Sequence, residues 1–132
     1  MNAPGLARAA AAVLALEGIA LVVVALIETF GLGSGDAANL ATALALIVLT
    51  LVGAAALIAF ALGTLRGRSW ARSGGVVLQV LAVALALAAL TLQPVTWLFV
   101  LGVGVPGILG FVLLISSARR EIESDGPTAG RG

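Results

Sequence analysis

The 132-residue sequence contains no cysteine, histidine, lysine or tyrosine, and only 10% of its residues are charged. Without cysteine and histidine the chain can form no disulfide, zinc finger, thiol nucleophile or imidazole base. Without lysine and tyrosine it also lacks Schiff-base and phenol chemistry. The remaining residues show no nucleophile–base pair and no metal cluster, so we expect a protein that is not an enzyme and that uses no cofactor. The net charge of +1 does not indicate a nucleic-acid-binding surface.

Apolar residues dominate instead, because 61% of the chain is hydrophobic, whereas soluble domains carry about 45–50%. This composition excludes both a soluble globular domain and a disordered chain. A helix needs about 20 apolar residues to cross a bilayer, and four runs approach or exceed that length: 9–30, 38–65, 73–92 and 95–115. We predict an all-α membrane protein. Residues 1–118 would form an up-and-down bundle of four transmembrane helices, and residues 119–132 a disordered cytoplasmic tail.

The positions of the basic residues predict how this bundle is oriented. The seven basic residues are Arg8, Arg66, Arg68, Arg72, Arg119, Arg120 and Arg131. All of them fall before the first run, between the second and third runs, or after the fourth. Basic residues stay on the cytoplasmic side of a membrane, so both termini are expected in the cytoplasm of a multi-pass plasma-membrane protein. The cluster of Arg66, Arg68 and Arg72 is expected to fix this topology and to hold anionic lipid headgroups, at about 1 kcal/mol per basic residue.

Glu17 is the most informative polar residue of the chain. It lies nine residues after Arg8, which is about 13 Å along a helix and close to the bilayer midplane. A charged side chain there costs about 2.5–3.5 kcal/mol on insertion scales, so we expect Glu17 to be protonated or paired within the bundle. Glu28 follows eleven residues later, a rotation of only about 20°. Both carboxyl groups therefore share one helix face, which must point into the bundle or at a partner.

Gln79 in the third run is the predicted partner of Glu17. It lies nine residues after Trp70, as Glu17 lies nine after Arg8, and the first and third helices of the predicted bundle run in the same direction. Our hypothesis is that neutral Glu17 hydrogen-bonds Gln79 across the helices. Two interpretations of the candidate polar site formed by Glu17, Gln79 and Glu28 stay open. One is a proton or cation site, and the other is a hydrogen bond that fixes helix register, worth about 0.6–2 kcal/mol.

The fourth run contains several glycines around a proline. Gly102, Gly104 and Gly107 match the pattern G-x-G-x-x-G, but that fingerprint needs a strand, a tight turn and a helix, so we interpret the match as accidental. Pro106 is expected to kink a membrane helix and to free the carbonyl of Gly102. A freed carbonyl can coordinate an ion, although a packing kink is the commoner case. We therefore predict that Gly102, Pro106, Gly107 and Gly110 form a kink and a packing face.

Five short features stand out from the apolar background: Leu16-Glu17-Gly18, Gly67-Arg68-Ser69-Trp70-Ala71-Arg72, Gln79, Gly104-Val105-Pro106 and Ala118-Arg119-Arg120. The 27 alanines and the use of arginine without lysine fit a GC-rich genome. With these features the chain resembles small four-helix integral membrane proteins of high-GC Gram-positive (actinobacterial) bacteria. Members of that group are described only as membrane proteins. The resemblance therefore implies a fold and a location, and it implies no activity.

Two functions remain as predictions. The first is a structural or accessory subunit whose alanine- and glycine-rich faces pack against copies of itself or another membrane protein in the lipid bilayer. The alternative is a small proton- or cation-linked transporter or channel that uses Glu17. A glutamate in the first of four membrane helices is also similar to the small multidrug transporters. Those proteins use aromatic residues within the membrane and nearly balanced charges, whereas this chain has no tyrosine and places every arginine on one side.

Overall fold

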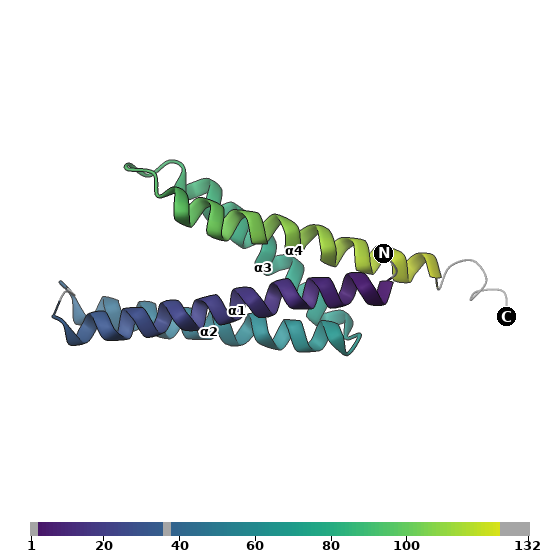
Figure 1. Cartoon of the computed structure of the whole chain (residues 1–132), viewed down its shortest axis with the longest axis horizontal. Coiled ribbons are helices and arrows are strands. Elements are labelled where there is room, and N and C mark those ends of the chain that lie inside the picture. The colour runs from purple at the N-terminus through teal and green to yellow at the C-terminus, as the bar shows by residue number, and fades with distance from the viewer. Residues whose placement is uncertain (1–2, 36–37, 125–132) are drawn as a thin grey trace.

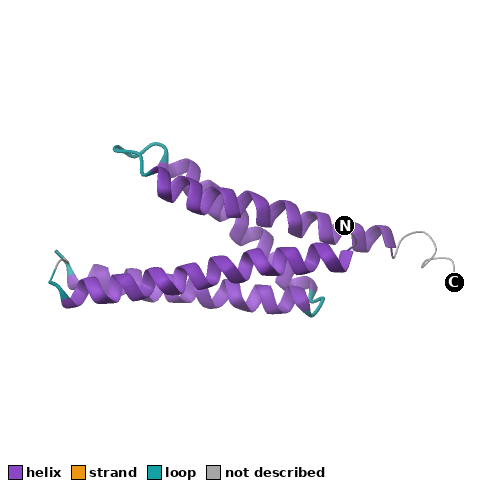
Figure 2. Cartoon of the chain, viewed as in Figure 1, coloured by secondary structure: helices purple, strands orange, loops and turns teal. Residues whose placement is uncertain are grey.

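The computed structural model describes residues 3–35 and 38–124, and within them every regular element is a helix. The four helices follow one another as α1 (Ala3–Gly33), α2 (Leu40–Leu65), α3 (Ser69–Ala89) and α4 (Trp97–Ser124), as Figures 1 and 2 show. Each of them is long and apolar enough to cross a membrane. The predicted all-α class with four candidate membrane helices is therefore confirmed.

The helix boundaries differ from the predicted runs, mostly because the helices continue past their apolar segments. α1 begins at Ala3 instead of residue 9, and α4 continues to Ser124 instead of ending at 115. α3 is displaced, since it runs from Ser69 to Ala89 and not over 73–92. Residues 119–124 were expected in a disordered tail, and this expectation is corrected because they form the last turns of α4. Apolar composition marks the segment that suits lipid, whereas backbone hydrogen bonds carry a helix beyond it. Residues 125–132 lie outside the described residues.

Both ends of α2 are closed by local hydrogen bonds that the sequence supplies. Asn39 precedes the helix in an extended conformation, and its side chain accepts a hydrogen bond from the backbone N–H of Thr42 at 3.1 Å. At the other end Gly67 has a φ of +69°, which glycine adopts without a steric penalty. The N–H groups of Gly67 and Arg68 donate to the carbonyls of Thr64 and Gly63, the pattern of a Schellman cap. This turn leads directly into α3.

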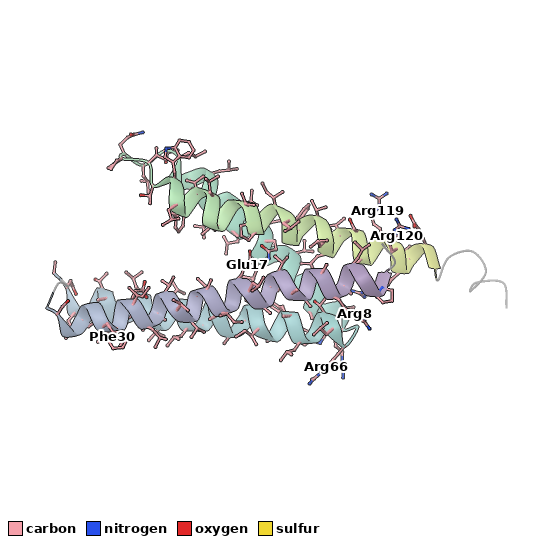
Figure 3. All side chains as sticks on the ribbon, viewed as in Figure 1. Arg8, Glu17, Phe30, Arg66, Arg119 and Arg120 are labelled. Atoms are coloured by element: carbon pink, nitrogen blue, oxygen red, sulfur yellow. The ribbon has the colours of Figure 1, made fainter. Side chains whose placement is uncertain are left out.

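The helices form a closed ring in which α1 packs on α2 and α4, and α3 packs on α4 and α2. α1 and α3 lie diagonally across this ring. Figure 3 shows Arg8, Arg66, Arg119 and Arg120 together at one end of the molecule, which we call the basic end, and Phe30 at the opposite end. Figure 1 shows that the α1–α2 hairpin and the α3–α4 hairpin are close at the basic end and diverge toward the opposite end.

The shared core of the four helices lies in the half of the molecule near the basic end. Its largest members are Leu14 of α1, Leu57 of α2 and Leu114 of α4, and small alanines fill the space between them. α3 contributes Gly75, where an added methyl group would lie 3.0 Å from Leu114 and 3.4 Å from Leu14. Beyond this core the buried residues include Ala25. An added methyl group at Gly53 of α2 would lie against Leu21 of α1, and one at Gly104 of α4 against Ala86 of α3. These contacts lie within each hairpin, in agreement with the divergence in Figure 1.

Large apolar side chains cover the outer surface of every helix. Phe30 is 79% exposed, Leu49 67%, Val77 65% and Leu98 85%. A soluble monomer does not expose apolar surface on this scale, whereas lipid tails solvate it without cost. The surface therefore agrees with the composition in indicating a chain that lies in a membrane.

Candidate functional site

The position of Glu17 is set by the residue that follows it. The nearest atoms to an added methyl group at Gly18 all belong to α2: Ile58 at 2.8 Å, the carbonyl oxygen of Ala54 at 3.3 Å and Leu57 at 3.4 Å. Gly18 therefore lies on the face of α1 that packs closely on α2. Neighbouring helical positions differ by about 100°, so Glu17 points away from α2 and toward the other hairpin. Its side chain is half-buried, and Figure 3 shows it between the two ends of the molecule.

Gln79 of α3 meets Glu17 across the diagonal of the bundle. Its Nε2 donates a hydrogen bond to Oε2 of Glu17 at 2.6 Å. Gln79 is fully buried, with 0% of its surface exposed. The structure thus contains the interhelical contact that the equal depth of the two residues predicts. It is the polar link between two helices that otherwise touch little.

Glycines provide the space that the Gln79 side chain occupies. An added methyl group at Gly110 of α4 would lie 2.6 Å from Nε2 and 2.8 Å from Cδ of Gln79. At Gly107, one turn earlier, an added methyl group would lie 3.2 Å from the Val83 side chain and 3.5 Å from the backbone carbonyl oxygen of Gln79. α4 therefore approaches α3 closely at both positions, as predicted for small residues in a membrane helix. The sequence did not show that Gly110 also makes room for the polar pair.

Gly102 takes no part in helix packing within the chain, and its predicted packing role stays a prediction. An added methyl group at Gly102 would meet nothing within 4 Å, whereas one at Gly104 would lie 3.1 Å from Ala86 of α3. Gly104, Gly107 and Gly110 follow one another at three-residue spacing and share a face, and Gly102 lies off that face. Pro106 lies inside α4, as expected. The packing face of α4 thus begins at Gly104.

Glu28 lies on the same side of α1 as Glu17 and is also half-buried. Its Oε2 is buried and has no hydrogen-bond partner. Eleven residues separate the two carboxyl groups, about 16 Å along the helix, so the structure does not bring Glu28 into the Glu17–Gln79 pair. The candidate polar site therefore consists of one hydrogen-bonded pair and one separate carboxyl group.

The basic cluster divides into two parts. Arg66 and Arg68 are exposed at the α2–α3 turn. Arg72 instead forms an ion pair with Glu121 of α4, and its side chain is only 14% exposed. The Arg72 charge is thus directed at a carboxylate of α4, and the prediction that the three arginines hold lipid headgroups stays a prediction. The ion pair connects the start of α3 to the end of α4.

In the described ranges no group of three or more acidic, histidine or cysteine residues could hold a metal ion.

Gly75 is a site residue that the sequence analysis missed. Its spacing of four residues from Gln79 on α3 placed both on one face and was the signal that could have identified it.

The chain matches no protein family, no curated protein and no solved structure. Its likeness to four-helix membrane proteins of actinobacteria therefore stays a prediction from short motifs.

Proposed function

We propose that the chain is a multi-pass plasma-membrane protein whose helices alternate across the bilayer and whose termini are both cytoplasmic. The support is the gathering of Arg8, Arg66, Arg119 and Arg120 at one end of the molecule (Figure 3), since basic residues stay in the cytoplasm. The opposite connections, 34–39 and 90–96, contain no basic residue.

Single cysteines test this orientation directly, because the native chain has none. A membrane-impermeant maleimide applied to intact cells should label Ser34→Cys and Gln93→Cys. It should label Ser69→Cys only after the membrane is permeabilised. The reverse pattern, or labelling of all three in intact cells, would refute the proposed orientation.

Within that membrane we propose a non-enzymatic structural or accessory subunit that packs with itself or with a membrane partner. The observation that carries this proposal is a set of small residues four apart on the outer surface. Ala55 and Ala59 of α2 are both exposed, and so are Ala84 and Ala88 of α3. Small residues at this spacing let a second helix approach the backbone closely, which drives helix association in lipid. Ala54 and Ala61, by contrast, are buried inside the bundle.

Native mass spectrometry of the tagged protein, extracted from its own host in mild detergent, tests the proposal. We expect a stable complex, either with a different membrane protein or between copies of this chain. Ala59→Leu should weaken that complex because it blocks close approach. Ala20→Leu on α1 is a matched control, since Ala20 is exposed and has Leu16 and Val24 four residues away instead of small residues. A wild-type protein that is monomeric under these conditions would contradict the proposal.

The hydrogen bond between Glu17 and Gln79 favours a second candidate, a small proton- or cation-linked transporter or channel. Ionisable groups inside a membrane commonly mark a pathway for ions or protons. Proton or cation flux into proteoliposomes should then fall sharply in the Glu17→Gln variant. It should persist in Glu28→Gln, which removes the other carboxylate of α1. Flux that Glu17→Gln leaves unchanged removes Glu17 from any transport mechanism.

A further inference from the structure

The carbonyl oxygen of the Gln79 side chain is the least satisfied part of the polar pair. Gln79 is fully buried, and its Nε2 already donates to Glu17. Its Oε1 is buried without a hydrogen-bond partner. An amide oxygen is an acceptor only, and a buried acceptor without a donor is strongly disfavoured in an apolar surrounding. The pair therefore requires one further donor directed at Oε1.

Within the described residues no basic side chain forms an ion pair with Glu17. α2 contains no ionisable residue at all. The ionisable residues of the other three helices, apart from Glu17 itself, are Arg8, Glu28, Arg72, Arg119, Arg120, Glu121 and Glu123. The nearest arginines along the chain are Arg8, nine residues before Glu17, and Arg72, seven residues before Gln79. They are about 13 Å and about 10 Å away along their helices, and Arg72 is already paired with Glu121.

We infer that the ligand of this site is a proton, held by the Glu17 carboxyl group and donated to Oε1 of Gln79. Nε2 of Gln79 donates to one carboxyl oxygen of Glu17, and the protonated second oxygen donates back. The result is a closed acid–amide pair with two antiparallel hydrogen bonds. A single proton thereby supplies the missing donor and removes the unbalanced charge.

The same geometry argues against a metal cation at this site. Metal cations of the Mg²⁺ and Ca²⁺ class need six or more oxygen ligands, whereas the Gln79 amide lies against Gly110, and Gly75, Leu14 and Leu114 pack together one turn nearer the basic end. The Nε2–H group aimed at Glu17 Oε2 would also repel a cation placed on that carboxylate. Proton binding does not depend on transport, so the inference stands apart from the second candidate function. A failed flux assay would leave it intact.

Infrared spectroscopy of the protein in liposomes at pH 7 tests the inference, because a protonated carboxyl group absorbs at a different frequency from carboxylates and amides. We expect a protonated-acid band that is reduced in Glu17→Gln and unchanged in the control Glu123→Gln, whose carboxylate is exposed near the end of α4. Gln79→Leu should move this band to higher frequency, since the acid O–H loses its acceptor. The inference is overturned if Glu17→Gln removes only carboxylate absorption, or if the band does not move in Gln79→Leu.

Thermal unfolding supplies a second readout, because Glu17→Gln mimics the protonated acid. Its amide can donate to Gln79 Oε1 and accept from Nε2, so this variant should fold and unfold at the wild-type temperature at pH 7. At alkaline pH the wild type should lose stability as the proton leaves, and Glu17→Gln should not. A wild type that is more stable than Glu17→Gln at pH 7 and insensitive to alkali would overturn the inference.

Discussion

The close contact between Gly110 and the Gln79 amide allows the cost of a single methyl group to be worked out. In Gly110→Ala the new Cβ would lie 2.6 Å from Nε2 and 2.8 Å from Cδ of Gln79, too close for either atom to stay in place. The amide must move, and it loses its bond to Glu17, worth about 0.6–1.7 kcal/mol. Overpacking by the new methyl group destabilises the protein by about 1–3 kcal/mol more. Replacing glycine by alanine in a helix stabilises it by about 0.5–1 kcal/mol through backbone entropy, which offsets part of this loss. The expected net loss is about 1–4 kcal/mol.

Gly102→Ala on the same helix is the matched control. Its Cβ would meet nothing within 4 Å, so stability should stay unchanged or rise by about 0.5–1 kcal/mol. Unfolding by sodium dodecyl sulfate in mixed micelles, followed by the fluorescence of Trp70 and Trp97, measures both variants. Combining Gly110→Ala with Gln79→Ala, which shortens the opposing side chain, should reduce the cost of the Gly110 methyl by at least about 1 kcal/mol. The reasoning would be refuted if the losses of stability in Gly110→Ala and Gln79→Ala simply add in the double variant, or if Gly102→Ala costs as much as Gly110→Ala.

Three further changes can be measured in the same unfolding assay. Gly63→Ala should cost about 3 kcal/mol, because its Cβ would collide with the Cβ of Ala71 in α3, which cannot rotate away. The control Gly31→Ala should not destabilise, because its Cβ would meet nothing within 4 Å. Arg72→Gln should cost about 1 kcal/mol through loss of its ion pair with the partly exposed Glu121, and the difference should shrink at high salt. Asn39→Ala should cost about 1 kcal/mol by removing the cap of α2, and Asn39→Asp should restore most of it.

Those parts of the fold that depend on the bilayer as a solvent were predictable from the sequence. Runs of about 20 apolar residues are what a membrane helix needs, so the existence of four helices followed from composition. The depth of Glu17 and Gln79 followed from counting residues between each of them and the basic end. Their hydrogen bond could be predicted for the same reason, because a polar group in lipid must find a partner at its own depth.

The packing of the helices could not be predicted in the same way. In water a helix hides its apolar face, and the periodicity of the sequence marks that face. In lipid both faces are apolar, so exposed Leu49 and buried Leu57 look alike in the sequence. Gly102 and Gly110 look alike for the same reason, although only Gly110 lies against another helix. The divergence of the two hairpins depends on these contacts and left no signal in the pattern.

This ambiguity gives the Glu17–Gln79 pair a structural consequence of its own. Apolar faces of similar shape can slide or rotate against one another with little change in energy, because lipid solvates each of them equally well. A hydrogen bond between diagonal helices is formed at one depth and in one rotation only. It also needs a bundle narrow enough for the two side chains to meet. Three glycines allow this close packing: Gly18 lies against α2, Gly75 against the core leucines, and Gly110 against Gln79. The glycines and the polar pair therefore depend on each other, and together they select one register in the half of the molecule where all four helices share a core.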